Sequence, residues 1–153
     1  HMKKLLSILM GLGLILILVG CSSQETATFT HKSNNAEFIV TYTYDKKNDT
    51  VTKLKMEMNE SAESALSLKG NKKLSGEVKK NGVVVSIKEK DGKRISLIEI
   101  DLTKTTLSSL KESGNVSFPA LISEGFLVED GDHASFSKSK EVMLQLGFTE
   151  LKK

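Results

Sequence analysis

Segments of alternating apolar and polar residues, separated by short turn sequences, constrain the fold of this chain more than any other feature. Leu74–Lys80, Val83–Lys90 and Lys93–Leu102 are separated by Asn81-Gly82 and Asp91-Gly92. Such dipeptides favour type I′ turns, in which both central residues take positive φ angles and join adjacent antiparallel strands. The three segments are therefore predicted to form a three-stranded meander.

An earlier part of the chain is predicted to form a second group of strands. Glu37–Asp45 alternates so that its apolar and aromatic side chains share one face, and Thr50–Met58 alternates in the same way. The turn-like sequence Lys46-Lys47-Asn48-Asp49 lies between them and predicts a hairpin. Thr26–His31 is predicted to add an edge strand before this hairpin.

A helix is predicted after each group of strands. The first helix begins after Asn59, which suits an N-cap position, and ends at Gly70, which suits the position that follows a helix. The second helix spans Thr103–Ser113 and turns Leu107 and Leu110 inward. The order of elements thus gives two β-β-β-α-like units.

One further helix is predicted near the C-terminus. Ser135–Leu146 has an apolar side that comprises Phe136, Val142, Met143 and Leu146. Gly147 ends this helix, and Phe148 is placed to fold back on it as in a Schellman motif. Asn115–Asp132 shows no periodicity, and Phe118-Pro119 is expected to break regular structure there. Grouped strands and helices of this kind favour an α+β fold with an antiparallel sheet and two to three helices.

The N-terminal residues predict where this domain lies. His1-Met2 is interpreted as a cloning remnant, and the two lysines that follow begin an export signal. The uncharged run Leu5–Val19 is shorter than the roughly 20 residues that a spanning helix needs, and it has the length of a signal-peptide core. It ends in Leu18-Val19-Gly20-Cys21, which resembles the lipobox of bacterial lipoproteins. A plain secretory signal or an uncleaved anchor is the alternative.

The resemblance to a lipobox implies that Cys21 receives a diacylglycerol group and becomes the mature N-terminus. Two acyl chains hold a protein firmly, because each buried CH₂ contributes about 0.8 kcal/mol. The chain is thus divided into a remnant and lipoprotein signal peptide at residues 1–20, a lipidated cysteine and polar tether at 21–25, and a single domain at 26–153. The expected location is the extracytoplasmic face of the cell membrane.

Composition excludes several classes of protein. Cys21 is the only cysteine, which excludes a disulfide scaffold and a cysteine-zinc site. The net charge is +3, the lysines are interspersed with acids, and Arg94 is the only arginine. Nucleic-acid binders usually carry a basic stripe with arginines and aromatic side chains, so we expect no nucleic-acid partner.

Motifs that would carry catalysis or hold a cofactor are weak in this chain. Glu129-Asp130-Gly131-Asp132-His133 is the densest cluster of possible metal ligands, but it lacks the alternating order of a calcium loop. Acidic residues with a glycine before a helix are also ordinary turn chemistry, so we expect no metal and no cofactor. His31 lacks a partner whose spacing would predict catalysis. Tyr42 and Tyr44 could line a ligand pocket, although aromatic residues two apart more typically lie in a core.

Three stretches carry a family resemblance: the strand pair EFIVTYTYD and TVTKLKMEM, and the C-terminal SFSKSKEVMLQLGFTELK. They resemble a known bacterial family, the YehR-like lipoproteins, which has no established function. The resemblance covers nearly all of residues 21–153 and includes the lipobox at Cys21. It implies an α+β fold with an antiparallel sheet, and it supplies no catalytic residue.

These observations favour a membrane-anchored lipoprotein that is not an enzyme and that binds a small ligand or a protein of the cell envelope. One alternative is a metal-dependent enzyme that uses the carboxylates and imidazole of residues 129–133. Another is a structural component of the envelope that docks a second protein through a sheet edge or through Leu121–Val128.

Overall fold

The computed structural model describes residues 23–61 and 76–152. The export signal, the lipobox with Cys21 and most of the first predicted helix lie outside these ranges. The strands within them are β1 (Gln24–Lys32), β2 (Ala36–Asp45), β3 (Thr50–Glu60), β4 (Gly76–Lys80), β5 (Val83–Lys90), β6 (Lys93–Asp101), β7 (Val128–Asp130), β8 (His133–Ser135) and β9 (Thr149–Leu151). The helices are α3 (Leu107–Lys111), α4 (Ser117–Ser123) and α5 (Phe136–Gln145).

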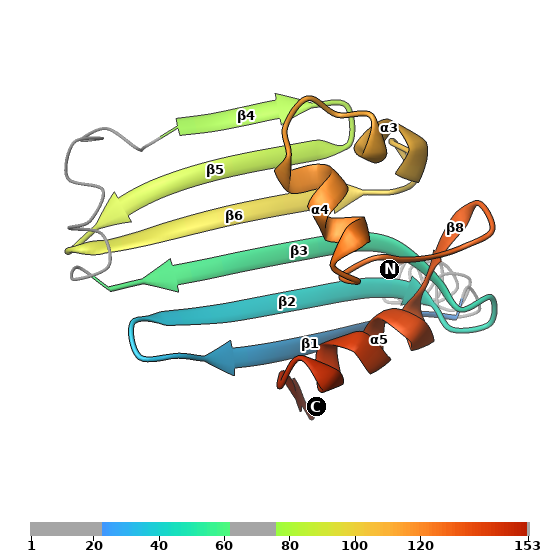
Figure 1. Ribbon diagram of the computed structural model, residues 1–153, viewed down its shortest axis with the longest axis horizontal. Coiled ribbons are helices and arrows are strands. Elements are labelled where there is room, and N and C mark those ends of the chain that lie inside the picture. Colours follow the sequence, from blue (N-terminus) through green and yellow to red (C-terminus); the bar gives the residue numbers. More distant parts are fainter. Residues whose placement is uncertain (1–22, 62–75, 153) are drawn as a thin grey trace, which may run out of the picture.

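The strands form one sheet with the order β4-β5-β6-β3-β2-β1-β9, and all pairs are antiparallel. The two predicted strand groups join through the pairing of β3 with β6. The short β7–β8 hairpin attaches to the start of β3. All three described helices lie on one face of the sheet, α3 and α4 toward the β5–β6 side and α5 over β1 and β2 (Figure 1). The predicted α+β fold with an antiparallel sheet is confirmed.

The two dipeptide turns differ in conformation. Asp91 and Gly92 have φ angles of 52° and 75°, which confirms the type I′ turn predicted between β5 and β6. At the β4–β5 turn Gly82 has a φ angle of 76°, but Asn81 does not take a positive φ angle, so a type I′ turn is wrong there. The Asn81 side chain instead donates to the carbonyl of Lys104 at 3.0 Å.

The first strand group is longer than predicted at both ends. β3 continues through Asn59 and Glu60, so the N-cap predicted at Asn59 is wrong. Both residues are paired on two sides, with β2 and with β6, and this ladder competes with a local cap. β1 begins at Gln24, so Gln24 and Glu25 belong to the sheet and not to a tether. β1 also pairs with β9, so it is not an edge strand.

The helices between β6 and β7 differ from the prediction in two ways. α3 begins at Leu107 rather than at Thr103, and Thr106 caps it by accepting from the Ser109 amide at 3.1 Å. α4 was missed because Pro119 was expected to break regular structure. Pro119 lies in the first turn of α4, where a missing N–H removes no intrahelical hydrogen bond, so that expectation was wrong.

The C-terminal helix agrees closely with the prediction. α5 begins after the N-cap Ser135, and Gly147 follows it with a φ angle of 92°. The Phe148 amide donates to the carbonyl of Met143 at 3.0 Å, which confirms the Schellman motif. Leu146 is 49% exposed, so its predicted inward position was wrong.

The core lies between the helices and the sheet. Tyr42 is fully buried, makes an edge-to-face contact with Phe29 and donates to the carbonyl of Phe126 at 2.7 Å. Tyr44 stacks on Phe136 with 3.6 Å between ring centroids. These contacts confirm the core interpretation of both tyrosines. Other core residues are Ala27, Val40, Val51, Leu54, Ile100, Leu107, Leu110, Leu121, Leu127, Ala134 and Met143.

A register shift in the β2–β3 ladder shapes this core. Thr43 pairs with Lys53 and Tyr44 pairs with Val51, which leaves Thr52 as an extra residue in β3. Val51 and Leu54 are three residues apart and would face opposite sides of a regular strand. The bulge allows both side chains to be buried in the same core.

Candidate functional site

The side of the sheet away from the described helices carries a row of polar side chains from several strands. Thr41, Lys55 and Glu99 are cross-strand neighbours on β2, β3 and β6, and the row continues through β5 to Lys79 on β4. Because successive side chains of a strand face opposite sides, these residues point away from the core that holds Leu54. Thr43, Lys53 and Asp101 form a second, parallel row nearer the end of the sheet.

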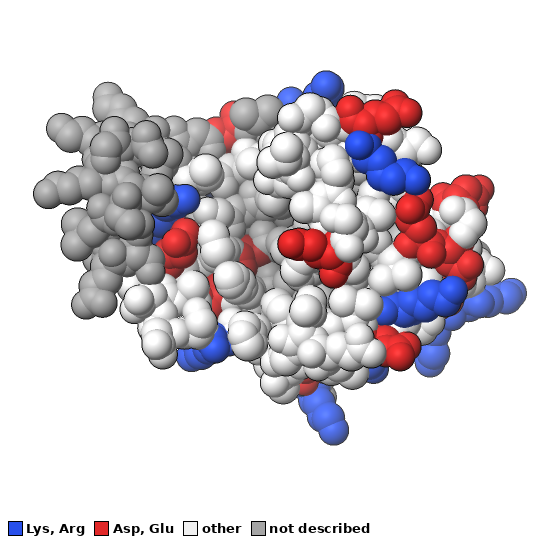
Figure 2. Space-filling view, in the orientation of Figure 1, with Lys and Arg blue, Asp and Glu red and all other residues white. Residues whose placement is uncertain are grey.

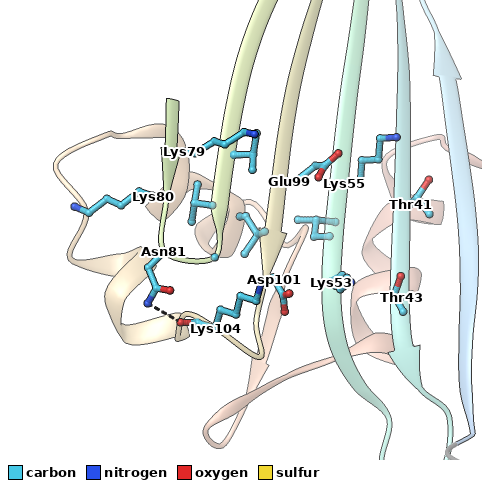
Figure 3. A pocket seen from close by; sticks show the side chains of 15 residues that line it. Thr41, Thr43, Lys53, Lys55, Lys79, Lys80, Asn81, Glu99, Asp101 and Lys104 are labelled. Atoms are coloured by element: carbon cyan, nitrogen blue, oxygen red, sulfur yellow. Dashed lines mark hydrogen bonds between the residues drawn. The ribbon is translucent and has the colours of Figure 1, made fainter. Parts of the chain in front are cut away.

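These two rows line a depression of about 590 Å³ that is partly open to solvent. The β4–β5 turn and the segment after β6 bound it at one end through Asn81, Gly82 and Lys104. Figure 3 shows the side chains of both rows on the same side of the strands. We call this depression the lysine groove. Its charged residues are Lys53, Lys55, Lys79, Lys80, Lys104, Glu99 and Asp101, which gives a net charge of +3.

The ammonium groups of the groove are largely free of internal partners. Lys79 lies 3.6 Å from a carboxylate oxygen of Glu77, and both side chains are more than half exposed. Within residues 23–61 and 76–152, the other four lysines of the groove have no carboxylate within 4.0 Å. An exposed pair such as Lys79–Glu77 contributes little and is readily exchanged. The positive charge of the groove is therefore available to a ligand.

Asp101 contributes to the turn after β6 as well as to the groove. The Thr103 hydroxyl donates to its carboxylate, and the Thr103 amide donates to the same oxygen at 2.9 Å. These hydrogen bonds, together with the nearby charges of Lys53 and Lys104, outweigh a small effect of burial and lower the pKa of Asp101. Asp101 is thus held in place by its own turn.

The composition of the groove favours an anionic, hydrogen-bonding ligand. Its volume falls within the range of small-molecule sites, and its lining combines apolar surface with ammonium, hydroxyl and amide groups. Lysine ammonium groups bind phosphate and carboxylate groups as point charges, and the hydroxyls of Thr41 and Thr43 can donate to the same oxygens. Sequence reasoning missed this site because its residues come from strands that are far apart in the chain. Alternation in Thr50–Met58 does predict Lys53 and Lys55 on the face opposite Leu54, and the structure confirms it.

The acidic segment at residues 129–133 does not form a ligand cluster. It folds as the β7–β8 hairpin, with Gly131 at a φ angle of 68°. Glu129 pairs with Lys111 at 2.8 Å, and Asp130 lies 3.7 Å from Lys138. In the described part of the chain, no three or more His, Cys, Asp or Glu side chains gather where they could hold a metal ion. Charged side chains of the helix-covered face gather mainly toward the end of the molecule with this hairpin (Figure 2).

A polar cluster around Asp49 lies near this hairpin. The hydroxyls of Ser135 and Ser137 donate to the Asp49 carboxylate at 2.6 and 2.7 Å, and the Ser137 amide donates at 2.8 Å. Partial burial raises the pKa of Asp49, but these hydrogen bonds and the charge of His133 outweigh that effect and lower it. In a serine-nucleophile triad an imidazole lies between the hydroxyl and the carboxylate, whereas here the hydroxyls donate directly to the carboxylate. The arrangement is therefore not that of such a triad. The cluster ties the β2–β3 turn to the start of α5.

His31 and the segment Leu121–Val128 are part of the packing. The His31 ring lies 5.3 Å from that of Phe148, between centroids, and its Nδ1 is 3.3 Å from the carbonyl oxygen of Gly147. Leu121 and Leu127 are in the core, so the hypothesis that their segment offers an apolar docking surface is not supported. None of the helices in the described ranges is long and apolar enough to span a bilayer.

Comparison with known proteins supports the family resemblance. No family model matches the chain. The chain is 27% identical over 161 aligned positions to an uncharacterized lipoprotein, Lin0239, of Listeria innocua, and the match covers 99% of this chain and 98% of that protein. The fold of the present chain is similar to that of the Escherichia coli YehR protein, solved by NMR, with a TM-score of 0.55 and 19% identity over 86% of this chain and 93% of the other. The resemblance to the YehR-like lipoproteins is thus confirmed.

A second solved structure has the same fold. The NMR structure of a protein from Streptococcus pneumoniae TIGR4 matches with a TM-score of 0.51 and 14% identity, over 84% of this chain and 85% of that one. At these identities the two solved structures establish the fold. The described residues of this chain must therefore carry the argument about function.

Proposed function

We propose that this protein is a lipid-anchored binding protein of the bacterial cell envelope that takes an anionic ligand in the lysine groove and performs no catalysis. The lysine groove is the observation that carries the proposal, because the residues that line it carry a net charge of +3. A ligand with two or more phosphate or carboxylate groups can contact several ammonium groups at once.

The anchor rests on the sequence around Cys21 and on the lipoprotein that resembles this chain over nearly its whole length. A diacylglycerol thioether at Cys21 would hold the domain at the outer side of the membrane. The test is to express the full chain with Cys21 and with Cys21→Ser in a bacterial host. The first should carry the lipid mass and sediment with membranes, whereas the second should lose both properties. A lipidated Cys21→Ser protein would refute this assignment.

The groove is tested with inorganic tripolyphosphate as the probe. We expect the full chain, purified in uncharged detergent at low salt, to bind tripolyphosphate in isothermal titration calorimetry. Lys53→Ala/Lys55→Ala should weaken this binding at least tenfold. The matched control is Lys32→Ala/Lys88→Ala, which removes two charges outside the groove and should change the affinity less than threefold. Equal loss in both double variants would show general charge attraction and contradict a specific groove.

A further inference from the structure

We infer that the anionic groups recognised by the lysine groove are the phosphate headgroups of acidic phospholipids in the membrane that holds the anchor. The inference rests on the proposed function and names its ligand class. It would place the domain with the side of the sheet away from the described helices toward the bilayer.

The described chain begins at a fixed point at one end of the sheet. The Ser23 hydroxyl donates to Asp45 at 2.6 Å, and the Ser23 carbonyl accepts from the Lys46 amide at 2.9 Å. Gln24 already pairs with Asp45 in the sheet. Only Ser22 separates Ser23 from Cys21, and two residues of extended chain span at most about 7 Å. A lipid on Cys21 would therefore hold this end of the sheet close to the headgroups.

The groove lies near the same end. The row of Thr43, Lys53 and Asp101 also includes Thr26, which is two residues from Gln24 along β1. Two residues of strand rise about 7 Å, and β3 lies two strand spacings, about 10 Å, from β1. The backbone of Lys53 is thus roughly 12 Å from the start of β1, a distance that a lysine side chain and a lipid headgroup can bridge. The β4–β5 turn and the end of β6 lie at this end of the sheet as well (Figure 1).

The charge of the groove matches acidic lipids. Phosphatidylglycerol and related lipids present many phosphates in one plane, so several lysines can be neutralised at once. Lysines near such a surface are attracted within about one Debye length, roughly 8–10 Å at physiological salt. A short anchor raises the local concentration of headgroups around the groove, since binding becomes intramolecular. Weak individual contacts with Lys53, Lys55 and Lys104 are then sufficient to orient the domain.

The experiment measures this orientation with a spin label in the groove. The full lipidated chain with Thr41→Cys is labelled with a nitroxide and reconstituted in vesicles of phosphatidylcholine alone or with 30% phosphatidylglycerol. Because lipidation blocks the thiol of Cys21, the label attaches to the new cysteine. Ser108→Cys, an exposed site on α3 at the opposite side of the sheet, is the matched control.

Acidic lipid should reduce the collision rate of the Thr41→Cys label with a water-soluble nickel complex at least threefold. The Ser108→Cys label should be unaffected, and high salt or Lys53→Ala/Lys55→Ala should remove the difference. Equal exposure of Thr41→Cys in both vesicles, or protection of Ser108→Cys instead, would overturn the inference.

Failure of the inference and failure of the proposed function can be told apart. A lipidated protein that binds tripolyphosphate in the groove, but whose label is not protected by acidic lipid, would refute the inference. The proposed function would stand, and the ligand would then be a soluble anion. A mass that lacks the lipid would refute the anchor, and the inference with it. A lipidated protein that binds neither probe would refute the groove as an anion site.

Discussion

Asp49 is the side chain whose replacement most sharply tests how this fold holds together. It accepts three hydrogen bonds from Ser135 and Ser137 across 86 to 88 residues of sequence. Its φ angle of 51° is in the left-handed region, where Asp and Asn are tolerated better than most other residues. Replacement therefore changes two separate contributions, the hydrogen bonds and the backbone conformation.

The expected loss of stability can be worked from these contacts. A typical helix cap is worth about 1 kcal/mol, and hydrogen bonds to a charged group are worth about 1.5–3 kcal/mol when buried. Asp49 is only partly buried, so we expect its three bonds to contribute roughly 2 kcal/mol in total. Asp49→Ala loses these bonds and also places an alanine in the left-handed conformation, which costs about 1 kcal/mol more. It should therefore lower the free energy of unfolding by about 3 kcal/mol. Asp49→Asn keeps one acceptor and the tolerated backbone, and it should cost about 1 kcal/mol.

Urea unfolding measures these differences. With an m value of about 2 kcal/mol/M, Asp49→Ala should lower the midpoint by roughly 1.5 M and Asp49→Asn by about 0.5 M. The low pKa of Asp49 stabilises the folded state above its unfolded pKa, and this contribution is lost as the pH falls through the lower, folded value. The gap between wild type and Asp49→Asn should therefore narrow below about pH 4. Equal midpoints for both variants, or a gap independent of pH, would refute this account.

Two further substitutions probe the core. Gly125→Ala should lower the free energy of unfolding by about 3 kcal/mol, because φ is 89° and the new Cβ would lie 2.7 Å from Cγ1 of Val142. In thermal denaturation, a second substitution, Val142→Ala, should restore part of the lost stability. An unchanged melting temperature of Gly125→Ala would contradict the clash. Tyr42→Phe should lower the free energy of unfolding by about 1–2 kcal/mol in urea, because it removes the donor to the carbonyl of Phe126. Tyr44→Phe keeps its stacked ring and should cost less. Equal effects of the two substitutions would count against the hydrogen bond.

Features set by adjacent residues could be predicted from the sequence. The Asp91-Gly92 turn and the Schellman motif at Gly147 each depend on a few neighbouring positions, and both are present. The β2–β3 hairpin is also local, since its strands are joined by four residues. In these cases the preferred local conformation and the final structure coincide.

Features that depend on distant pairing could not be predicted in the same way. Asn59 suits an N-cap, but pairing with both β2 and β6 extends β3 through it. The lysine groove needs Lys53 beside Asp101, and no local pattern reveals that β3 and β6 are neighbours. The β7–β8 hairpin has strands of three residues, too short for a periodic signal. Asp49 gives no sign in the sequence of its partners on α5.

The groove and the core are two results of one register. β3 buries Leu54 on one side and exposes Lys53 and Lys55 on the other, so a shift of one residue would exchange them. That shift would bury charged lysines, which costs several kcal/mol for each unpaired charge, and the core therefore fixes which face is basic. The bulge at Thr52 confines the single irregularity of the β2–β3 ladder to the end of the strand next to the groove. A substitution that weakens the core without a register change should thus leave the charge pattern of the groove intact.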